Sequence, residues 1–198
     1  MKQGFTLIEL LIVVAIIAIL AAIAVPNFLE AQTRSKVSQC MADMRSLATA
    51  LESYATVYNG YPPYGRIATD DSVHYPATQN NMDDKMCFAG SCLTTPTAFI
   101  TSFFDDPFAT NFQTNKELMK KYEYLNLKQH LANFPNPPPV WTKDLLHWWG
   151  YWRMVGAGPD QDRGLDIKIN VVYDPTNGTV SDGDIVRSQA RSDNTPHP

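Results

Sequence analysis

The hydrophobic positions in the first 58 residues of this chain follow two successive patterns. From Phe5 to Val25 every side chain is apolar except Thr6 and Glu9, and a helix of this length can cross a membrane. The apolar positions then recur at three- and four-residue steps: Val37, Met41, Met44, Ala48, Leu51, Ala55 and Tyr58. This spacing predicts a helix that packs on a domain along one face. We therefore expect one long helix over residues 5–58, with its transmembrane segment over 5–28.

Proline and glycine occur at two informative places in this predicted helix, one in its interior and one at its end. Pro26 predicts a kink or a short melted stretch, because proline cannot donate the backbone hydrogen bond that a helix interior needs. Asn59 and Gly60, followed by Pro62 and Pro63, predict that the helix ends near residue 58.

Glu9 is the unusual residue of the apolar run. A carboxylate inside a membrane span is costly and usually has a partner. No small-residue cleavage site follows the run, whereas Gly4 stands immediately before it. Cleavage after Gly4 would create an amine at Phe5, about one helical turn from Glu9. That amine is poorly placed for Glu9 of its own chain, but it can meet Glu9 of a second chain stacked with an axial offset.

The segment MKQGFTLIELLIVVAIIAILAAIAVPNFLEAQ resembles the N-terminus of type IV pilins and type II secretion pseudopilins. The resemblance implies that a prepilin peptidase cuts after Gly4 and N-methylates Phe5. It also implies that Glu9 serves assembly and that Pro26 is the proline that kinks the helix. The implied fold is α+β, with a long N-terminal helix packed on a small antiparallel head whose C-terminal region is rich in loops. The domains would be a leader at 1–4, the helix at 5–58 and a periplasmic or extracellular head at 59–198.

The head sequence is long enough for one hydrophobic core. Its pattern predicts an irregular segment over 61–94, helices from 94 to about 104 and over 116–130, and strands over 151–155 and 167–173. The Leu-Thr-Thr-Pro motif at 93–96 and the Asp-Pro-Phe motif at 106–108 also resemble the head of pseudopilins related to the major type II secretion subunit.

Several aspartates gather near the C-terminus. Asp160, Asp162 and Asp166 alternate with other residues around Gly164, and Asp182 and Asp184 follow. Carboxylate oxygens from a flexible loop suit Ca²⁺, and the segment resembles the Ca²⁺ loop of major pseudopilins. It departs from that loop because the stretch YDPTNGTVSDGD is added after it. The alternative is a solvated acidic turn in which each side chain bonds its own backbone.

The three cysteines separate into a close pair and a single residue. Cys87 and Cys92 bracket four residues and predict a disulfide if the head lies outside the cytoplasm; the alternative is two buried or free thiols. Cys40 lies on the helix and is interpreted as a small core residue.

Four tryptophans lie between Trp141 and Trp152. This cluster is typical either of a core beneath a long loop, which we favour, or of a surface that binds a sugar or a partner.

The remaining composition argues against two classes of protein. The formal net charge is −4 and no basic patch appears, so nucleic-acid binding is not expected. The four histidines, His74, His130, His147 and His197, are scattered, and no nucleophile, metal-protease or phosphate-loop motif is present. We therefore do not expect an enzyme.

These observations together predict a structural filament subunit. The chain would be stored in the bacterial inner membrane as a single-pass protein, processed by the prepilin peptidase and N-methyltransferase, and passed by an inner-membrane assembly platform into a helical homopolymer. That filament would be a periplasmic pseudopilus or a cell-surface pilus, and the head resemblance favours the secretion type. The alternative is a minor, tip-located pilin that acts as a membrane-anchored binding module.

Overall fold

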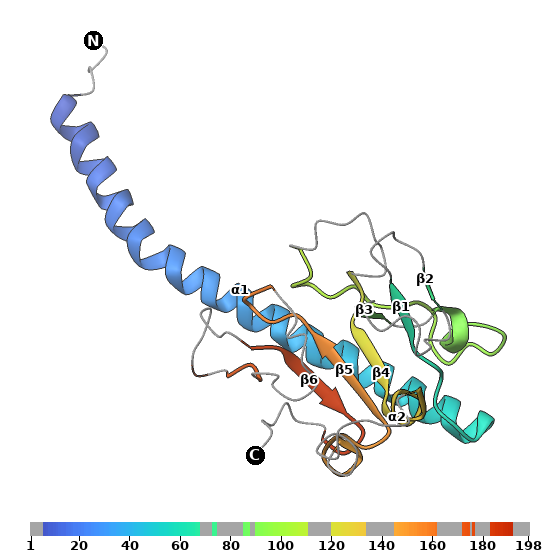
Figure 1. The fold of residues 1–198 in the computed structure, drawn as a ribbon. Helices are drawn as coiled ribbons and strands as arrows, with labels where there is room; N and C mark the ends of the chain where they lie inside the picture. Colours follow the sequence, from blue (N-terminus) through green and yellow to red (C-terminus); the bar gives the residue numbers. More distant parts are fainter. Residues whose placement is uncertain are drawn as a thin grey trace.

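The computed structural model describes residues 6–67, 73–74, 85–87, 90–110, 120–133, 145–161, 172–174, 176 and 183–191. One long helix, α1 (Leu7–Tyr58), precedes a mixed head (Figure 1). The head elements are β1 (Gly65–Ile67), β2 (Val73–His74), β3 (Lys85–Cys87), the 3-10 helix η2 (Gly90–Leu93), β4 (Glu123–Asn126), α2 (Leu127–Asn133), β5 (Trp152–Gly156) and β6 (Ile185–Ser188). The predicted α+β fold is confirmed.

The ends of α1 have local causes. At its N-terminus the Thr6 side chain accepts a hydrogen bond from the Glu9 amide, and the Glu9 side chain accepts one from the Thr6 amide, which forms a capping box. At its C-terminus Asn59 adopts a left-handed conformation with φ 54° and ψ 34°. Asparagine tolerates this conformation, which ends a helix. The predicted end at residue 58 is confirmed.

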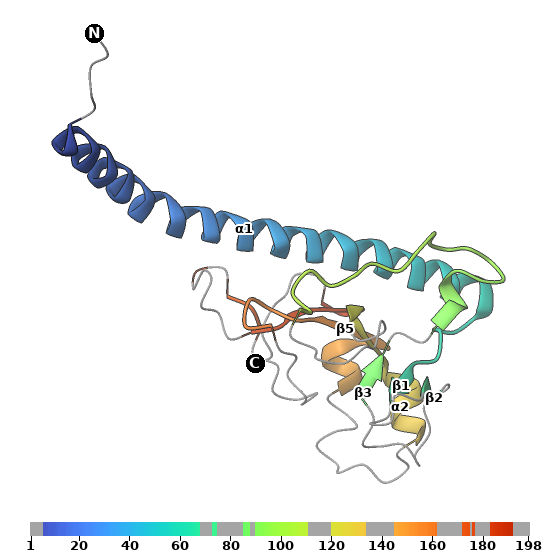
Figure 2. The ribbon, with the colours of Figure 1, turned by 90° about the horizontal axis from the view of Figure 1, so that it is seen from above.

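Of the kink or short melted stretch predicted at Pro26, the melted stretch is wrong, because Pro26 does not interrupt α1. The helix is continuous across it, and Figure 2 shows a curved N-terminal half. Proline removes one backbone hydrogen bond, and the neighbouring turns of a 52-residue helix retain theirs.

The described strands form two small antiparallel sheets. In the first, β1 lies between β2 and β3; in the second, β5 lies between β4 and β6. The register of the second sheet places Tyr124 opposite Met154, and Met154 opposite Arg187. The strand predicted over 151–155 is confirmed as β5, one residue further along the chain.

The hydrophobic core lies between the C-terminal half of α1 and the second sheet. Figure 2 shows this half of the helix running along the head, while the N-terminal half extends away from it. The helix contributes buried residues at the predicted spacing: Val37, Cys40, Met44, Leu47, Ala48, Ala50 and Leu51. Leu125, Met154 and Val155 are among the buried residues of the sheet. The amphipathic stripe is thus confirmed through Leu51, whereas Tyr58, at its end, is 45 % exposed.

The helix predicted from residue 94 is wrong. Residues 94–104 form turns and bends, and the amides of Phe99 and Ile100 both donate to the Leu93 carbonyl, at 2.8 and 3.2 Å. The Phe99 ring packs on Tyr54 and Tyr58, with centroids 5.6 and 6.2 Å apart. These contacts with the end of α1 favour a compact loop over a regular helix.

The helix predicted over 116–130 is only partly correct. Residues 123–126 form the strand β4, and α2 begins at Leu127. The side chains of Tyr124 and Leu125 are fully buried, and β5 supplies hydrogen bonds to this strand. The Asn126 side-chain oxygen then accepts the Gln129 amide at 3.0 Å, which starts α2. Of the strand predicted over 167–173, Val172 forms an isolated bridge with Asp184, and residues 167–171 lie outside the described residues.

Candidate assembly site

The N-terminal half of α1 presents an exposed apolar surface. Its large side chains are about half to three-quarters exposed, from Leu7 at 74 % to Phe28 at 67 %. By length and composition α1 can cross a membrane, and none of its most apolar stretch is buried against the head. Such a surface is stable in water only when lipid or another apolar surface covers it.

Glu9 is the one ionisable residue between positions 7 and 29. Its Oε2 atom accepts hydrogen bonds from the Thr6 amide at 2.8 Å and from the Thr6 hydroxyl at 2.7 Å. The Glu9 amide donates to the Thr6 Oγ1 at 3.3 Å. Within the described part of the chain these are the partners of the carboxylate, and its Oε1 atom receives no hydrogen bond from a described residue. Thr6 therefore holds the carboxylate at the first turn through one of its two oxygens.

Gly4 and Phe5 lie outside the described residues, so cleavage after Gly4 and methylation of Phe5 stay predictions. At the other end of the apolar stretch, Glu30 and Arg34 form an exposed ion pair at 2.5 Å. This pair marks the return of charged residues to the helix surface. The apolar surface is thus bounded by a carboxylate on one side and an ion pair on the other.

A hydrogen-bonded junction fixes α1 to the head near its C-terminus. The Trp152 indole donates to Glu52 Oε1 at 3.0 Å, and the Tyr61 hydroxyl donates to Glu52 Oε2 at 2.8 Å. Burial, together with the Glu52 carboxylate, raises the pKa of Tyr61 to about 12. Tyr61 therefore stays protonated and remains a donor to Glu52 across the physiological range.

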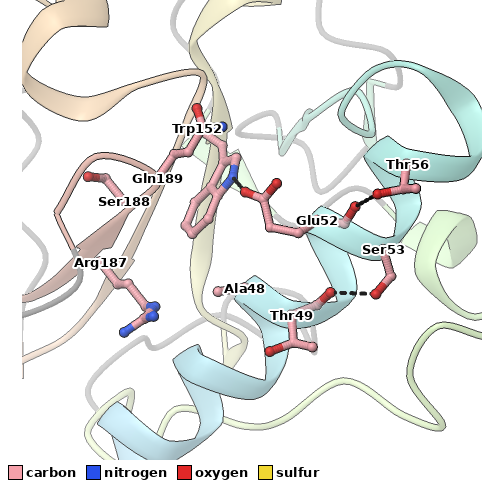
Figure 3. Close-up of a pocket in the computed structure, with 9 residues that line it drawn as sticks. All are labelled: Ala48, Thr49, Glu52, Ser53, Thr56, Trp152, Arg187, Ser188 and Gln189. Atoms are coloured by element: carbon pink, nitrogen blue, oxygen red, sulfur yellow. Dashed lines mark hydrogen bonds between the residues drawn. The ribbon is translucent and has the colours of Figure 1, made fainter.

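A groove of about 430 Å³ lies beside this junction, between α1 and the end of β6. Figure 3 shows the side chains that line it. Its helical wall carries the hydroxyls of Thr49, Ser53 and Thr56. Each donates to the carbonyl four residues earlier in α1, at 2.8–3.0 Å. The helix itself therefore uses the hydroxyl donors of this wall.

A buried polar cluster lies beneath the same face of the helix. Asp106 is 4 % exposed, and its carboxylate accepts the Ala157 amide at 2.7 Å and the Phe108 amide at 3.0 Å. Cys40 Sγ lies 3.9 Å from the same carboxylate. Burial, followed by the Asp106 charge, raises the pKa of Cys40 to about 12. Cys40 is therefore a protonated core thiol, as predicted.

Of the five predicted Ca²⁺ ligands, Asp160 and Asp184 are described, and Asp162, Asp166 and Asp182 are not. A Cβ atom on Gly158 would lie 1.8 Å from the Gly183 carbonyl oxygen. The segments that carry Asp160 and Asp184 therefore lie side by side, and this close approach requires glycine at 158. Among the described residues no group of three or more potential metal ligands is present. The Ca²⁺ site stays a prediction.

The predicted disulfide also stays a prediction, because the Cys87 side chain is outside the described atoms.

Three of the four tryptophans of the cluster are among the described residues. Trp149 and Trp152 are 3 % and 2 % exposed and belong to the core, which confirms the core interpretation for both. Trp148 is partly buried beneath the Arg191 guanidinium, whose carbon lies 4.8 Å from the ring centroid. Trp141 is outside the described residues.

Sequence reasoning missed two residues of this site. Thr6 was noted only as a polar break, although Thr-x-x-Glu before an apolar run is a capping-box signature. Glu52 gave no such signal, because its partners Tyr61 and Trp152 come from segments whose position depends on the whole fold.

Comparisons with known proteins match the apolar N-terminal segment of the chain to a known motif. Residues 1–25 match the family model of the prokaryotic N-terminal methylation motif. The chain is 52 % identical to the type IV major pilin protein PilA of Myxococcus xanthus over 63 residues, which are 32 % of this chain and 29 % of that pilin. No solved structure gives a significant match.

Two relatives are type II secretion system core proteins G. The protein from Pseudomonas aeruginosa is 33 % identical over 82 residues, 41 % of this chain and 48 % of the relative. The protein from Escherichia coli is 25 % identical over 174 residues, 85 % of this chain and 89 % of the relative. The alignments span about a third of the first pilins matched. The chain thus carries the methylation motif, and its relatives are type IV pilins and type II secretion core proteins G, as the resemblance predicted.

Proposed function

We propose that this chain is a structural subunit of a filament, of the type IV pilus or type II secretion pseudopilus kind. The observation that carries the proposal is the exposed apolar half of α1 with Glu9 held at its first turn by Thr6. Before assembly the bacterial inner membrane covers this surface. After assembly the same surface packs on the helices of neighbouring subunits.

In this proposal Glu9 sets the register of the subunits. A prepilin peptidase cuts after Gly4 and methylates the new amine of Phe5. The Glu9 oxygen that Thr6 leaves available then pairs with the amine of a neighbouring subunit. A subunit at the wrong axial offset would keep its charge unpaired among apolar side chains, and such a charge is strongly unfavourable.

We favour the secretion pseudopilus over the surface pilus. The alignment with the Myxococcus xanthus pilin covers 32 % of this chain, whereas the alignment with the Escherichia coli core protein G covers 85 % of it. The head and the helix therefore both find a counterpart in that relative. The partners expected from this role are further copies of the chain, the prepilin peptidase and an inner-membrane assembly platform.

The variant Glu9→Ala tests this role. It is expected to insert into the membrane and to be cleaved after Gly4, but its yield in filaments should fall at least tenfold. Glu30→Ala is the matched control, since it removes an exposed carboxylate from the same helix beyond the apolar stretch. Quantitative blotting of the assembled fraction measures both variants. A normal filament yield from Glu9→Ala would refute the proposal.

We further propose that the C-terminal aspartate loops bind Ca²⁺. The adjacency of the Asp160 and Asp184 segments at Gly158 supports a shared site, and Ca²⁺ takes six to eight oxygen ligands from such loops. Chelator is then expected to lower the Tm of the purified full chain, and added Ca²⁺ should restore it. Asp160→Asn should shrink that shift. An identical Tm with and without saturating chelator would refute the proposed Ca²⁺ binding.

A further inference from the structure

A second groove, of about 530 Å³, lies at the end of the molecule remote from the N-terminus. It is enclosed by the C-terminal end of α1, by α2 and by the turn before β5, elements that lie close together in Figure 1. Its lining includes Asn59, Tyr61, Asn126, Lys128, Gln129 and Tyr151. The volume falls within the range of about 300–1,000 Å³ that is usual for small-molecule sites. The groove is separate from the apolar half of α1, so it does not depend on the filament role.

Two tyrosine rings form the aromatic walls of the groove. The centroids of Tyr61 and Tyr151 are 6.2 Å apart with an interplanar angle of 33°. Tyr151 is 47 % exposed, whereas most of the large aromatic side chains described in the head are buried or partly buried. An exposed ring beside a second, tilted ring provides a flat apolar surface for the face of a cyclic ligand.

Gln189 holds both tyrosines in place. Its side-chain amide donates to the Tyr61 hydroxyl at 2.6 Å, and its side-chain oxygen accepts the Tyr151 amide at 2.7 Å. Gly150 precedes Tyr151 with φ at +77°, and a Cβ there would lie 2.7 Å from the Gln189 oxygen. Only glycine therefore permits this close approach. The Tyr61 hydroxyl and the backbone at Tyr151 are therefore held before any ligand arrives, which lowers the entropic cost of binding.

The floor of the groove is also fixed by hydrogen bonds. The Asn126 side-chain amide donates to the carbonyls of Tyr61 and Pro62 at 3.2 and 3.1 Å. The Gln129 side-chain oxygen accepts the Tyr64 amide at 2.9 Å. These polar side chains tie the segment after α1 to α2 and keep the groove open.

Two exposed polar side chains remain for recognition. Lys128 and Asn59 are exposed, and neither side chain makes a hydrogen bond to a described residue. Lys128 is the charged residue among those that line the groove, and no carboxylate is among them. The nearby Glu52 already accepts the Tyr61 hydroxyl and the Trp152 indole. A groove whose charged lining residue is a lysine favours an anionic ligand over a cationic one.

We propose that this groove binds an acidic oligosaccharide. The C–H face of a pyranose ring stacks on Tyr151, its hydroxyls bond the Asn59 amide, and its carboxylate pairs with the Lys128 ammonium. Tyr151, Asn59 and Lys128 thus each recognise a different property of the ligand: a flat apolar face, neutral hydroxyls and a negative charge.

The test uses the purified full chain in a polyoxyethylene detergent, which carries no sugar headgroup. Binding of tri-galacturonic acid is measured by isothermal titration calorimetry, with the neutral trisaccharide maltotriose as the comparison probe. Tri-galacturonic acid is expected to bind at least tenfold more tightly than maltotriose. Lys128→Ala should remove that preference, and Tyr151→Ala should weaken binding of both probes at least tenfold.

Tyr58→Ala is the matched control, because Tyr58 is 45 % exposed and outside the groove. It should bind tri-galacturonic acid as the unmodified chain does. Circular dichroism verifies that each variant is folded. Failure of the unmodified chain to bind tri-galacturonic acid would overturn the proposal. Equal affinity for the two probes, or unchanged affinity in Tyr151→Ala, would also overturn it.

Discussion

At the residue level, Thr6 and Glu9 do two things with one short motif. Their reciprocal hydrogen bonds cap α1, and they hold a carboxylate at the start of an apolar surface. A capped carboxylate keeps a defined orientation before assembly, whereas an uncapped one would sample several rotamers. The same contacts that start the helix therefore prepare the group that we propose to set subunit register.

The cap predicts an effect of Thr6→Val on the first helical turn. Loss of a threonine cap costs about 1 kcal/mol, equivalent to about fivefold faster hydrogen exchange. We expect this acceleration at the Glu9 amide of the full chain in detergent, measured by mass spectrometry or NMR, and Thr6→Ser should restore protection. Thr33→Val is the control, because the Thr33 hydroxyl bonds the Leu29 carbonyl inside the helix. Equal exchange at Glu9 in Thr6→Val and the unmodified chain would contradict the cap.

The Asp43 carboxyl predicts that the stability of the folded chain depends on pH. Burial raises its pKa above the ordinary value of 3.8, the Tyr122 hydroxyl at 3.0 Å opposes that rise, and the Asp106 charge adds to it. A carboxyl whose pKa is raised by folding contributes stability below its unfolded pKa and loses it as the pH rises through the folded pKa. Asp43→Asn avoids that loss of stability, and its side-chain amide oxygen can still accept the hydrogen bond from the Tyr122 hydroxyl.

We therefore expect Asp43→Asn to raise Tm by about 1–3 °C at pH 7 and to converge with the unmodified chain below about pH 4. Thermal unfolding followed by circular dichroism across pH 3–8 measures the difference. Glu30→Gln, on the exposed surface of the same helix, serves as the control. A gain that persists at pH 3, or a lower Tm at pH 7, would show that the Asp43 charge is not destabilising.

At the level of elements, α1 was predictable and the middle of the head was not. The apolar run, the stripe through Leu51 and the Asn-Gly stop are all local signals, and each describes a helix that the structure contains. Residues 94–104 and 123–126 depend on distant partners instead. Phe99 packs on the end of α1 and Tyr124 lies in a sheet with β5, so the tertiary contacts override the local pattern.

The junction between α1 and the head predicts a specific loss of stability. Glu52→Ala removes the acceptor of both the Trp152 indole and the Tyr61 hydroxyl. Trp152 is 2 % exposed, and leaving its indole N–H without an acceptor costs about 1–3 kcal/mol. Chemical denaturation of the full chain in detergent, followed by tryptophan fluorescence, should show this decrease. Glu30→Ala should change stability by less than about 0.5 kcal/mol, because its ion pair is exposed. Equal effects of the two variants would contradict the role of Glu52.

At the level of the whole molecule, the structure separates two tasks. One half of α1 is exposed and apolar, which suits a membrane and then a filament interior. The other half packs on the head, and its residues Met44 and Leu51 belong to the hydrophobic core. The sequence indicated this division because the two halves follow different patterns. It did not indicate the groove lined by Tyr61 and Tyr151, which are 90 residues apart in the chain and which Gln189, from a third segment, also contacts.

The central claim, that this chain is a processed filament subunit, is tested most directly by mass mapping of its N-terminus. Sheared filaments and cell envelope are separated, and the intact mass and N-terminal peptide of the chain are measured in each. We expect a terminus at a methylated Phe5, confined to the envelope if the filament is a periplasmic pseudopilus and abundant in the sheared fraction if it is a surface pilus. An uncleaved Met1 in both fractions would show that the chain is not a processed filament subunit.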